Sequence, residues 1–192
     1  MDIAAIYDRA FFEAHVPWQS EYSLIADLLA ARLPFASALD LGCGNGFLIA
    51  RLLTLGKTCD GVDGSPHAVA LAAPEAAPRI QVMDLRAPLS LGRRDLVICS
   101  EVAEHLEARY ADALVDNICS HCGQWAFFTA ATPGQGGHHH INEQPHDYWI
   151  SKFERRGFRL DSQTTRVLRC DLAERLNTLW WFTKNAMVFR AP

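Results

Sequence analysis

Apolar residues follow two different spacings along the chain, and their alternation predicts the fold class. Short continuous apolar runs are typical of buried parallel strands, whereas apolar residues three or four positions apart are typical of helices that cover a sheet. Strands are expected at 36–41, 58–62, 79–83, 95–100, 124–130, 158–165 and 185–190. Helices are expected at 3–11, 20–33, 47–55, 66–73, 108–121, 145–156 and 166–180. This order predicts an α/β domain with a mostly parallel sheet of about seven strands, helices on both faces and an antiparallel strand near the C-terminus.

The most informative local sequence joins the first expected strand to the next helix. It reads ALDLGCGNG from Ala38 to Gly46, so that three glycines alternate with other residues. Glycines let the backbone turn sharply and let a ligand approach the main chain, and the start of the helix adds free N–H donors. A dinucleotide-binding loop would carry a further glycine where Phe47 stands. The loop therefore predicts a ligand-binding turn that lacks the dinucleotide fingerprint.

This loop resembles motif I of class I S-adenosylmethionine-dependent methyltransferases, which have a Rossmann-like fold. Their pattern D/E-x-G-x-G-x-G cradles the cofactor, and Asp40 with the three glycines matches it. Asp63 matches the acid that accepts both ribose hydroxyls. Asp84 matches the acid that reads the adenine amino group, and Leu85 offers a backbone N–H. The cofactor-binding residues that the resemblance implies are Asp40, Gly42, Cys43, Gly44, Gly46, Asp63, Gly64, Ser65, Asp84, Leu85, Ser100 and Glu101.

The resemblance runs from about residue 40 to 157 and includes the segment after the fourth strand, E-x-x-E-H at 101–105. It implies an enzyme that transfers a methyl group from S-adenosylmethionine to an oxygen or nitrogen of a small-molecule acceptor. We expect one methyltransferase domain over 1–192, in which 1–35 form a helical cap and 36–192 form the Rossmann-like core.

Charge and composition limit the partners. The formal net charge of −4 gives no strong nucleic-acid signal. No apolar run reaches the ~20 residues that span a bilayer, and the first ten residues do not resemble a signal peptide. A cytoplasmic protein without a membrane partner is therefore expected, with its six cysteines as reduced thiols.

Many of the residues that could bind or activate the methyl acceptor lie in two segments, each of which follows an expected buried strand. Methyl transfer to a hydroxyl needs a group that removes a proton, and histidine does this near neutral pH. The candidate catalytic residues are His105, His139 and His140. The candidate substrate-binding residues are Tyr7, Phe11, Trp18, Glu104, His138 and Asn142.

Other hypotheses stay open. If a metal is present, its expected ligands are Glu101, Glu104, His105 and His140, which resemble the divalent-metal site of small-RNA 2′-O-methyltransferases. That reading implies methylation of an RNA or nucleotide ribose, and the lack of a basic face makes it the less favoured one. A non-catalytic nucleoside-binding protein is the third hypothesis.

A zinc site at Cys119 and Cys122 is disfavoured because no second C-x-x-C exists. The acceptor, the choice of base and the oligomeric state, a homodimer included, stay open.

Overall fold

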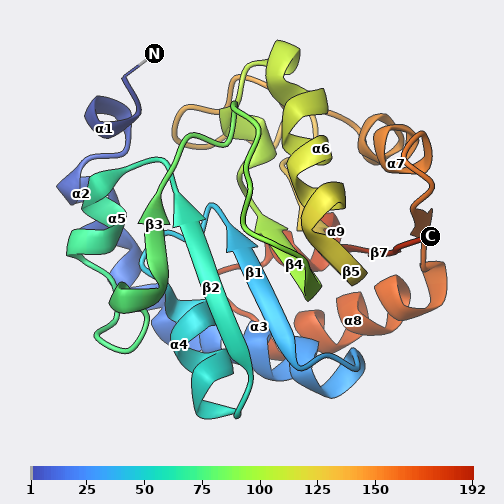
Figure 1. Ribbon diagram of the computed structural model, residues 1–192, viewed down its shortest axis with the longest axis horizontal. Helices are drawn as coiled ribbons and strands as arrows, with labels where there is room; N and C mark the ends of the chain where they lie inside the picture. The colour runs from blue at the N-terminus through green and yellow to red at the C-terminus, as the bar shows by residue number, and fades with distance from the viewer. Residues whose placement is uncertain (1) are drawn as a thin grey trace.

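The computed structural model describes residues 2–192, and its sheet confirms the expected fold class. Seven strands lie in the order β3-β2-β1-β4-β5-β7-β6 (Figure 1). Neighbours from β3 to β5 pair in parallel, whereas β7 pairs antiparallel with both β5 and β6. The strands are β1 (Ser37–Leu41), β2 (Thr58–Asp63), β3 (Ile80–Val82), β4 (Arg94–Ser100), β5 (Cys122–Thr129), β6 (Arg159–Leu160) and β7 (Met187–Arg190).

Helices cover both faces of this sheet. One layer contains α3 (Gln19–Arg32), α4 (Phe47–Thr54), α8 (Ser162–Arg175) and α9 (Trp181–Asn185). The other contains α6 (Ala111–His121) and α7 (His146–Glu154), while α5 (Pro66–Ala70) lies beside β2 and β3. Successive residues of one strand serve both layers, since Ala38 packs in the first core and Leu39 in the second. Burial on both sides explains why the strands read as continuous apolar runs.

The C-terminal third differs from the expected boundaries. The strand expected at 158–165 is wrong after residue 160, because the Asp161 carboxylate accepts a hydrogen bond from the Thr164 amide at 3.0 Å and so starts α8. The helix expected at 166–180 ends at Arg175. The turn that follows is held by Glu21, whose carboxylate accepts from three successive amides at 177–179. A helix-capping aspartate and a distant glutamate therefore override the local apolar spacing.

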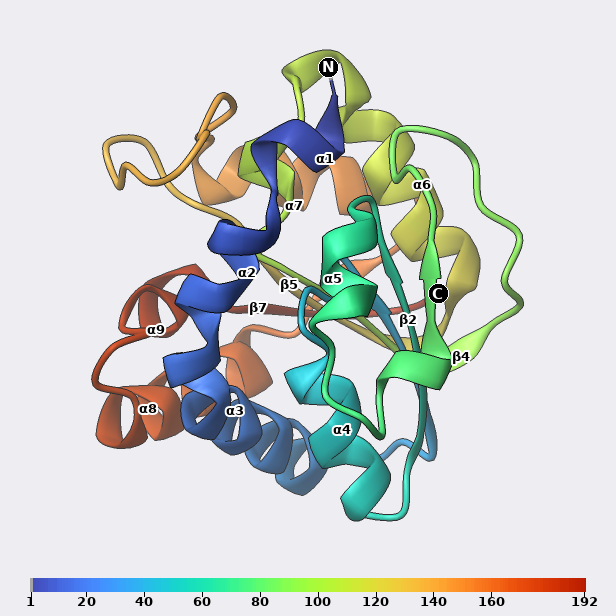
Figure 2. The same ribbon diagram turned by 90° about the vertical axis from the view of Figure 1, so that its left-hand side faces the viewer.

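The N-terminal cap is narrower than expected. Two short helices, α1 (Ile3–Ile6) and α2 (Arg9–His15), begin at Asp2 and Asp8, whose side chains cap them. Figure 2 shows both helices outside the sheet, on the side where α5 lies. The third helix, α3, instead packs in the core through Ile25 and Leu29. No described helix is long and apolar enough to cross a membrane.

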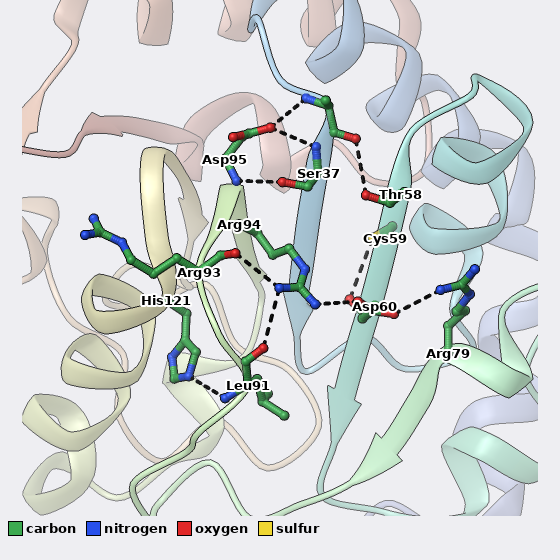
Figure 3. Close-up of polar contacts among 11 residues, drawn as sticks. Ser37, Thr58, Cys59, Asp60, Arg79, Leu91, Arg93, Arg94, Asp95 and His121 are labelled. Atoms are coloured by element: carbon green, nitrogen blue, oxygen red, sulfur yellow. Dashed lines mark hydrogen bonds and ion pairs between the residues drawn. The ribbon is translucent and has the colours of Figure 1, made fainter.

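The amino ends of the parallel strands are tied together by paired polar groups (Figure 3). The Asp95 carboxylate accepts from the amides of Ala36 at 2.8 Å and Ser37 at 2.9 Å, while the Ser37 hydroxyl accepts from the Asp95 amide at 3.0 Å. Asp60 on β2 forms an ion pair with Arg94 on β4 at 2.8 Å. These contacts hold β1, β2 and β4 in register at the end remote from the glycine loop.

Candidate active site

The carboxyl ends of β1, β2 and β4 border a cavity of about 470 Å³. Most of the residues predicted from the sequence line it: Tyr7, Phe11, Trp18, Asp40, Gly42, Cys43, Gly44, Asp63, Gly64, Asp84, Leu85, Ser100, Glu101, His105, His138 and His140. The other predicted residues lie outside its lining: Gly46, Ser65, Glu104, His139 and Asn142. The structure therefore brings both predicted segments and the cofactor loop to one cavity.

The glycine loop has the backbone that only glycine adopts easily. Gly42 has φ of +84° and Gly44 has φ of +51°. A Cβ atom at Gly42 would overlap the side chain of Val102. Gly46 allows close packing, because a Cβ there would lie 2.6 Å from Ala76 and 2.9 Å from Ile80, and its predicted contact with the cofactor remains a prediction.

Two backbone amides hold the Asp63 carboxylate at the end of β2, and each of its oxygens keeps a free lone pair. One carboxylate oxygen accepts from the Gly44 amide at 2.9 Å and the other from the Ser65 amide at 2.8 Å. Burial raises the pKa of Asp63, and the hydrogen bonds from backbone amides oppose that rise. Each oxygen can accept a further hydrogen bond, so the group suits two neighbouring hydroxyls.

Asp40 is the most unusual acid in the cavity. It is 1% exposed, and neither carboxylate oxygen has a hydrogen-bond partner within residues 2–192. Burial, and then the charge of Asp63, raises the pKa of Asp40 to about 8. A buried carboxylate without partners is costly, so this position suits a ligand that brings a donor or a positive charge.

Asp84 is already bound by its own neighbour. The Arg86 guanidinium donates to both carboxylate oxygens at 2.7–3.0 Å, and this hydrogen bonding lowers the pKa of Asp84. The expected contact with an adenine amino group therefore remains a prediction, and Arg86 joins the lining as a residue that sequence reasoning missed.

Ser65 positions the cap, which is why it faces away from the cavity. Its hydroxyl donates to the Tyr7 carbonyl at 2.7 Å and accepts from the His67 amide at 3.2 Å, which starts α5. The Tyr7 ring lies 5.4 Å from that of His105, and its hydroxyl is buried without a partner in the described chain. Burial, with the charges of Glu104 and Asp63, raises the pKa of Tyr7.

Aromatic side chains from α2, α9 and the turn before α3 form one wall of the cavity. Ring centroids of Phe11 and His15 are 4.3 Å apart, those of His15 and Trp18 are 4.5 Å apart, and those of Trp18 and Trp181 are 5.8 Å apart. Trp180 also lines the cavity and remains 54% exposed. Such a wall suits an apolar or planar acceptor.

The glycine-rich loop holds His140 against a carboxylate. His140 Nδ1 lies 3.0 Å from Glu143 Oε1, and the same carboxylate accepts from the amides of Gly134 at 2.8 Å and Gly136 at 2.6 Å. This hydrogen bond from His140 lowers the pKa of Glu143. A Cβ at Gly137 would overlap the His140 ring, so the glycine allows close packing there. Sequence reasoning placed the loop correctly but missed the role of Glu143.

His105 and His139 are placed differently from His140. His105 Nδ1 faces the His139 carbonyl at 3.4 Å, and burial, with the charge of His140, lowers the pKa of His105 to about 3. His139 lies outside the lining with φ of +53°, and its buried Nε2 has no partner within residues 2–192. Asn142 is also buried, where its amide donates to the Ala103 carbonyl at 3.3 Å.

Glu104 lies behind the cavity beside the two imidazoles. Its Oε1 accepts from the Ala131 amide at 3.1 Å, and its Oε2 has no partner among the described residues. Burial, and then the charge of Glu101, raises the pKa of Glu104. One ligand atom each of Glu104, His105 and His140 lie within 4.8 Å of one another. Of the four metal ligands weighed from the sequence, the structure therefore groups three.

Glu101 lies beside Glu104 and is held by two side-chain amides. Its carboxylate accepts from Asn185 Nδ2 at 3.2 Å and from Gln135 Nε2 at 3.4 Å, and its backbone has φ of +53°. Asn185 also donates to the Gln135 carbonyl oxygen at 2.9 Å. Sequence reasoning missed both amides, because Asn185 is 84 positions from Glu101 and no local pattern marks it.

Cys119 and Cys122 do not form a zinc site. His121, which lies between them, uses Nε2 to accept from the Leu91 amide at 3.0 Å and Nδ1 to contact the Asn117 carbonyl at 2.7 Å. Among residues 2–192, Glu104, His105 and His140 are the only group with metal-ligand spacing.

Two comparisons at the level of sequence relate part of this chain to methyltransferases. The model of a methyltransferase domain family matches residues 39–119. A ubiquinone biosynthesis O-methyltransferase from Methylobacterium nodulans is 34% identical over 102 residues, which cover 50% of this chain and 40% of that protein.

Solved methyltransferases share the whole fold. Magnesium protoporphyrin IX methyltransferase from Synechocystis, with bound SAH, superposes with a TM-score of 0.67 at 19% identity, over 98% of this chain and 92% of that one. A TehB-like SAM-dependent methyltransferase from Corynebacterium glutamicum gives 0.69 at 22% identity, over 96% and 100%. At under 25% identity, these likenesses show that the chain has the fold of class I S-adenosylmethionine-dependent methyltransferases.

Proposed function

We propose that this protein transfers a methyl group from S-adenosylmethionine to an oxygen or nitrogen of a small-molecule acceptor. The observation that carries the proposal is one cavity bordered by the glycine loop, by Asp40 and Asp63, and by the histidine loop. The O-methyltransferase name of the Methylobacterium relative supports an oxygen acceptor. The six free cysteines support the cytoplasm as its location.

The residues present fit this cofactor. Asp63 offers acceptors to the ribose hydroxyls, and the partnerless oxygens of Asp40 suit the cationic end of the ligand. Gly42 and Gly44 remove side chains from the approach to the main chain. The bound cofactor supplies an electrophilic methyl on its sulfonium.

The geometry favours His140 as the proton acceptor. Glu143 accepts from Nδ1, so the neutral imidazole keeps its Nε2 lone pair free, and the nearby carboxylate stabilises the imidazolium that forms. Burial lowers the pKa of His105, which disfavours its uptake of a second proton, and His139 lies outside the lining. Tyr7, Phe11 and Trp18 would exclude water from the reacting atoms.

Calorimetry with S-adenosylmethionine and S-adenosylhomocysteine tests cofactor binding, and transfer of labelled methyl to a panel of phenols, hydroxy acids and amines tests turnover. His140→Gln should lower kcat about 10²–10⁴-fold with little change in S-adenosylhomocysteine affinity. His67→Gln, outside the cavity on α5, is the matched control. Absence of cofactor binding would refute the proposal, and binding without turnover would favour the nucleoside-binding reading.

A second candidate function is favoured by the grouping of Glu104, His105 and His140. These side chains would hold a divalent metal that binds an acceptor hydroxyl, as in methylation of a nucleotide or RNA ribose. Each Nδ1 already faces a backbone or carboxylate oxygen, the orientation that metal-bound imidazoles show.

Equilibrium dialysis with Mn²⁺ separates the two candidates. Stoichiometric binding that is lost in His140→Gln and kept in His67→Gln would support the metal reading. Turnover that is unaffected by a chelator would exclude it.

A further inference from the structure

A second cavity lies beyond α9 from the proposed active site. It has a volume of about 510 Å³, and it shares no lining residue with the first cavity. Trp181 of α9 faces the first cavity, whereas Thr183 of the same helix lines the second. The remaining walls come from α7 and α8, and from Leu160 of β6 and Met187 of β7 at the end of the sheet (Figure 1).

Arg169 is a half-buried cation in this cavity without an anionic partner. Its Nε donates to the Ala186 carbonyl at 2.7 Å, and no carboxylate within residues 2–192 forms an ion pair with it. Burial lowers the pKa of its guanidinium. Every other half-buried arginine of the described chain pairs with an aspartate: Arg51, Arg86, Arg94 and Arg156. A guanidinium partly withdrawn from water is stabilised by an anion, so the free terminal nitrogens of Arg169 favour an anionic ligand.

His146 lines the same cavity, and its Nε2 is the candidate hydrogen-bond donor. Its Nε2 is buried and has no partner in the part of the chain that is described. Burial lowers the pKa of His146, and the charges of Arg169 and Lys184 lower it further, while Asp147 opposes them. Arg166 also lines the cavity, so two arginines of α8 and the His146 imidazole lie there with one aspartate, Asp147.

We propose that this cavity binds a phosphate-class oxyanion through Arg169 and Arg166, with His146 as a third donor. A tetrahedral oxyanion presents several acceptor atoms, which match the donors of two guanidinium groups and one imidazole. The phosphate is either free or carried on a larger molecule, since the recognising chemistry is the same. This site does not depend on the proposed methyl transfer.

The test is titration of the whole protein with inorganic phosphate at constant ionic strength, followed by calorimetry. We expect saturable binding that Arg169→Gln weakens at least about tenfold. Arg159→Gln, an exposed arginine on β6 outside the lining, should leave the affinity unchanged. Because Arg169 also holds the Ala186 carbonyl, exposed Arg166 gives a second variant, Arg166→Gln, which should weaken binding several-fold without disturbing the fold.

Two further measurements test the role of His146 and the source of the phosphate. NMR titration should show the His146 pKa rising when phosphate is added, because a bound anion stabilises the imidazolium. Equal affinity for phosphate and glycerol 2-phosphate indicates a free anion, and tighter binding of the ester indicates a phosphate carried on a larger molecule. No saturable binding at tens of millimolar phosphate, or equal losses in Arg169→Gln and Arg159→Gln, would overturn the proposal. S-adenosylhomocysteine affinity, measured alongside, reports separately on the first cavity.

Discussion

The two ends of the parallel strands differ in whether their carboxylates have hydrogen-bond or ion-pair partners. At the amino end, Asp95 and Asp60 each have several partners, and these contacts join neighbouring strands (Figure 3). At the carboxyl end, Asp40 and Glu104 carry buried oxygens with no partner, and they are the only carboxylates within residues 2–192 that do. Unpaired buried groups lower stability, so their concentration beside the cavity indicates groups kept for a ligand.

The largest expected difference between the two ends comes from replacing one glycine at each end by alanine, which adds one methyl group. Gly42→Ala, at the cofactor loop, combines φ of +84° with overlap of the Val102 side chain. We expect a loss of about 2–4 kcal/mol in the free energy of unfolding, measured by urea denaturation. Gly56→Ala, between α4 and β2, has φ of +75° but no atom within 4 Å, so we expect about 1 kcal/mol. Equal losses would show that the crowding at Gly42 is unimportant.

Two aspartates of β2 provide the next comparison. Asp63→Ala should weaken S-adenosylhomocysteine binding by about 1–3 kcal/mol, because it removes the proposed ribose acceptor. Asp60→Ala, three residues earlier at the amino half of the strand, should leave that affinity unchanged. Calorimetry measures both, and wild-type affinity in Asp63→Ala would contradict the ribose assignment.

Asp40 predicts a loss of stability with rising pH, opposite in sign to the effect of Asp95 at the amino end, where hydrogen bonds from backbone amides lower the pKa. Its folded pKa of about 8 lies above the ordinary value, so folded Asp40 keeps its proton while the unfolded chain ionises. Stability from this group is therefore complete at low pH and is lost as pH rises towards 8, by up to about 1.4 kcal/mol per pH unit. Asp40→Asn should flatten that slope in urea denaturation of the empty protein between pH 5 and 8. An unchanged slope would show that Asp40 is ionised in the folded protein.

The smallest effect is expected for Asp95→Ala. This change removes the acceptor for two amides near the start of β1 and should cost about 1 kcal/mol of stability. S-adenosylhomocysteine affinity should stay at the wild-type value, because Asp95 is at the end remote from the cavity. A loss of affinity would mean that the two ends are coupled through the sheet.

The cofactor half of the site was largely predictable from sequence, and the acceptor half only in part. Asp40, Gly42, Gly44 and Asp63 follow strands directly, and parallel strands bring their carboxyl ends to one edge. Ser65 and Gly46, predicted to bind the cofactor, lie outside the lining of the cavity, because spacing does not distinguish a residue that caps or packs a helix from one that lines a site.

The chain by itself determined the order of strands and helices, the loop beneath the proposed cofactor and the histidine-rich segment, since these depend on local periodicity and on glycine's backbone freedom. Only the tertiary structure decided that His140 pairs with Glu143, that Asn185 and Gln135 hold Glu101, and that no carboxylate among the described residues pairs with Arg169. Those relations depend on burial and on contacts between distant segments, which determine whether a polar side chain finds a partner. The same physical reason separates the two ends of the sheet, where identical residue types are paired at one end and left for a ligand at the other.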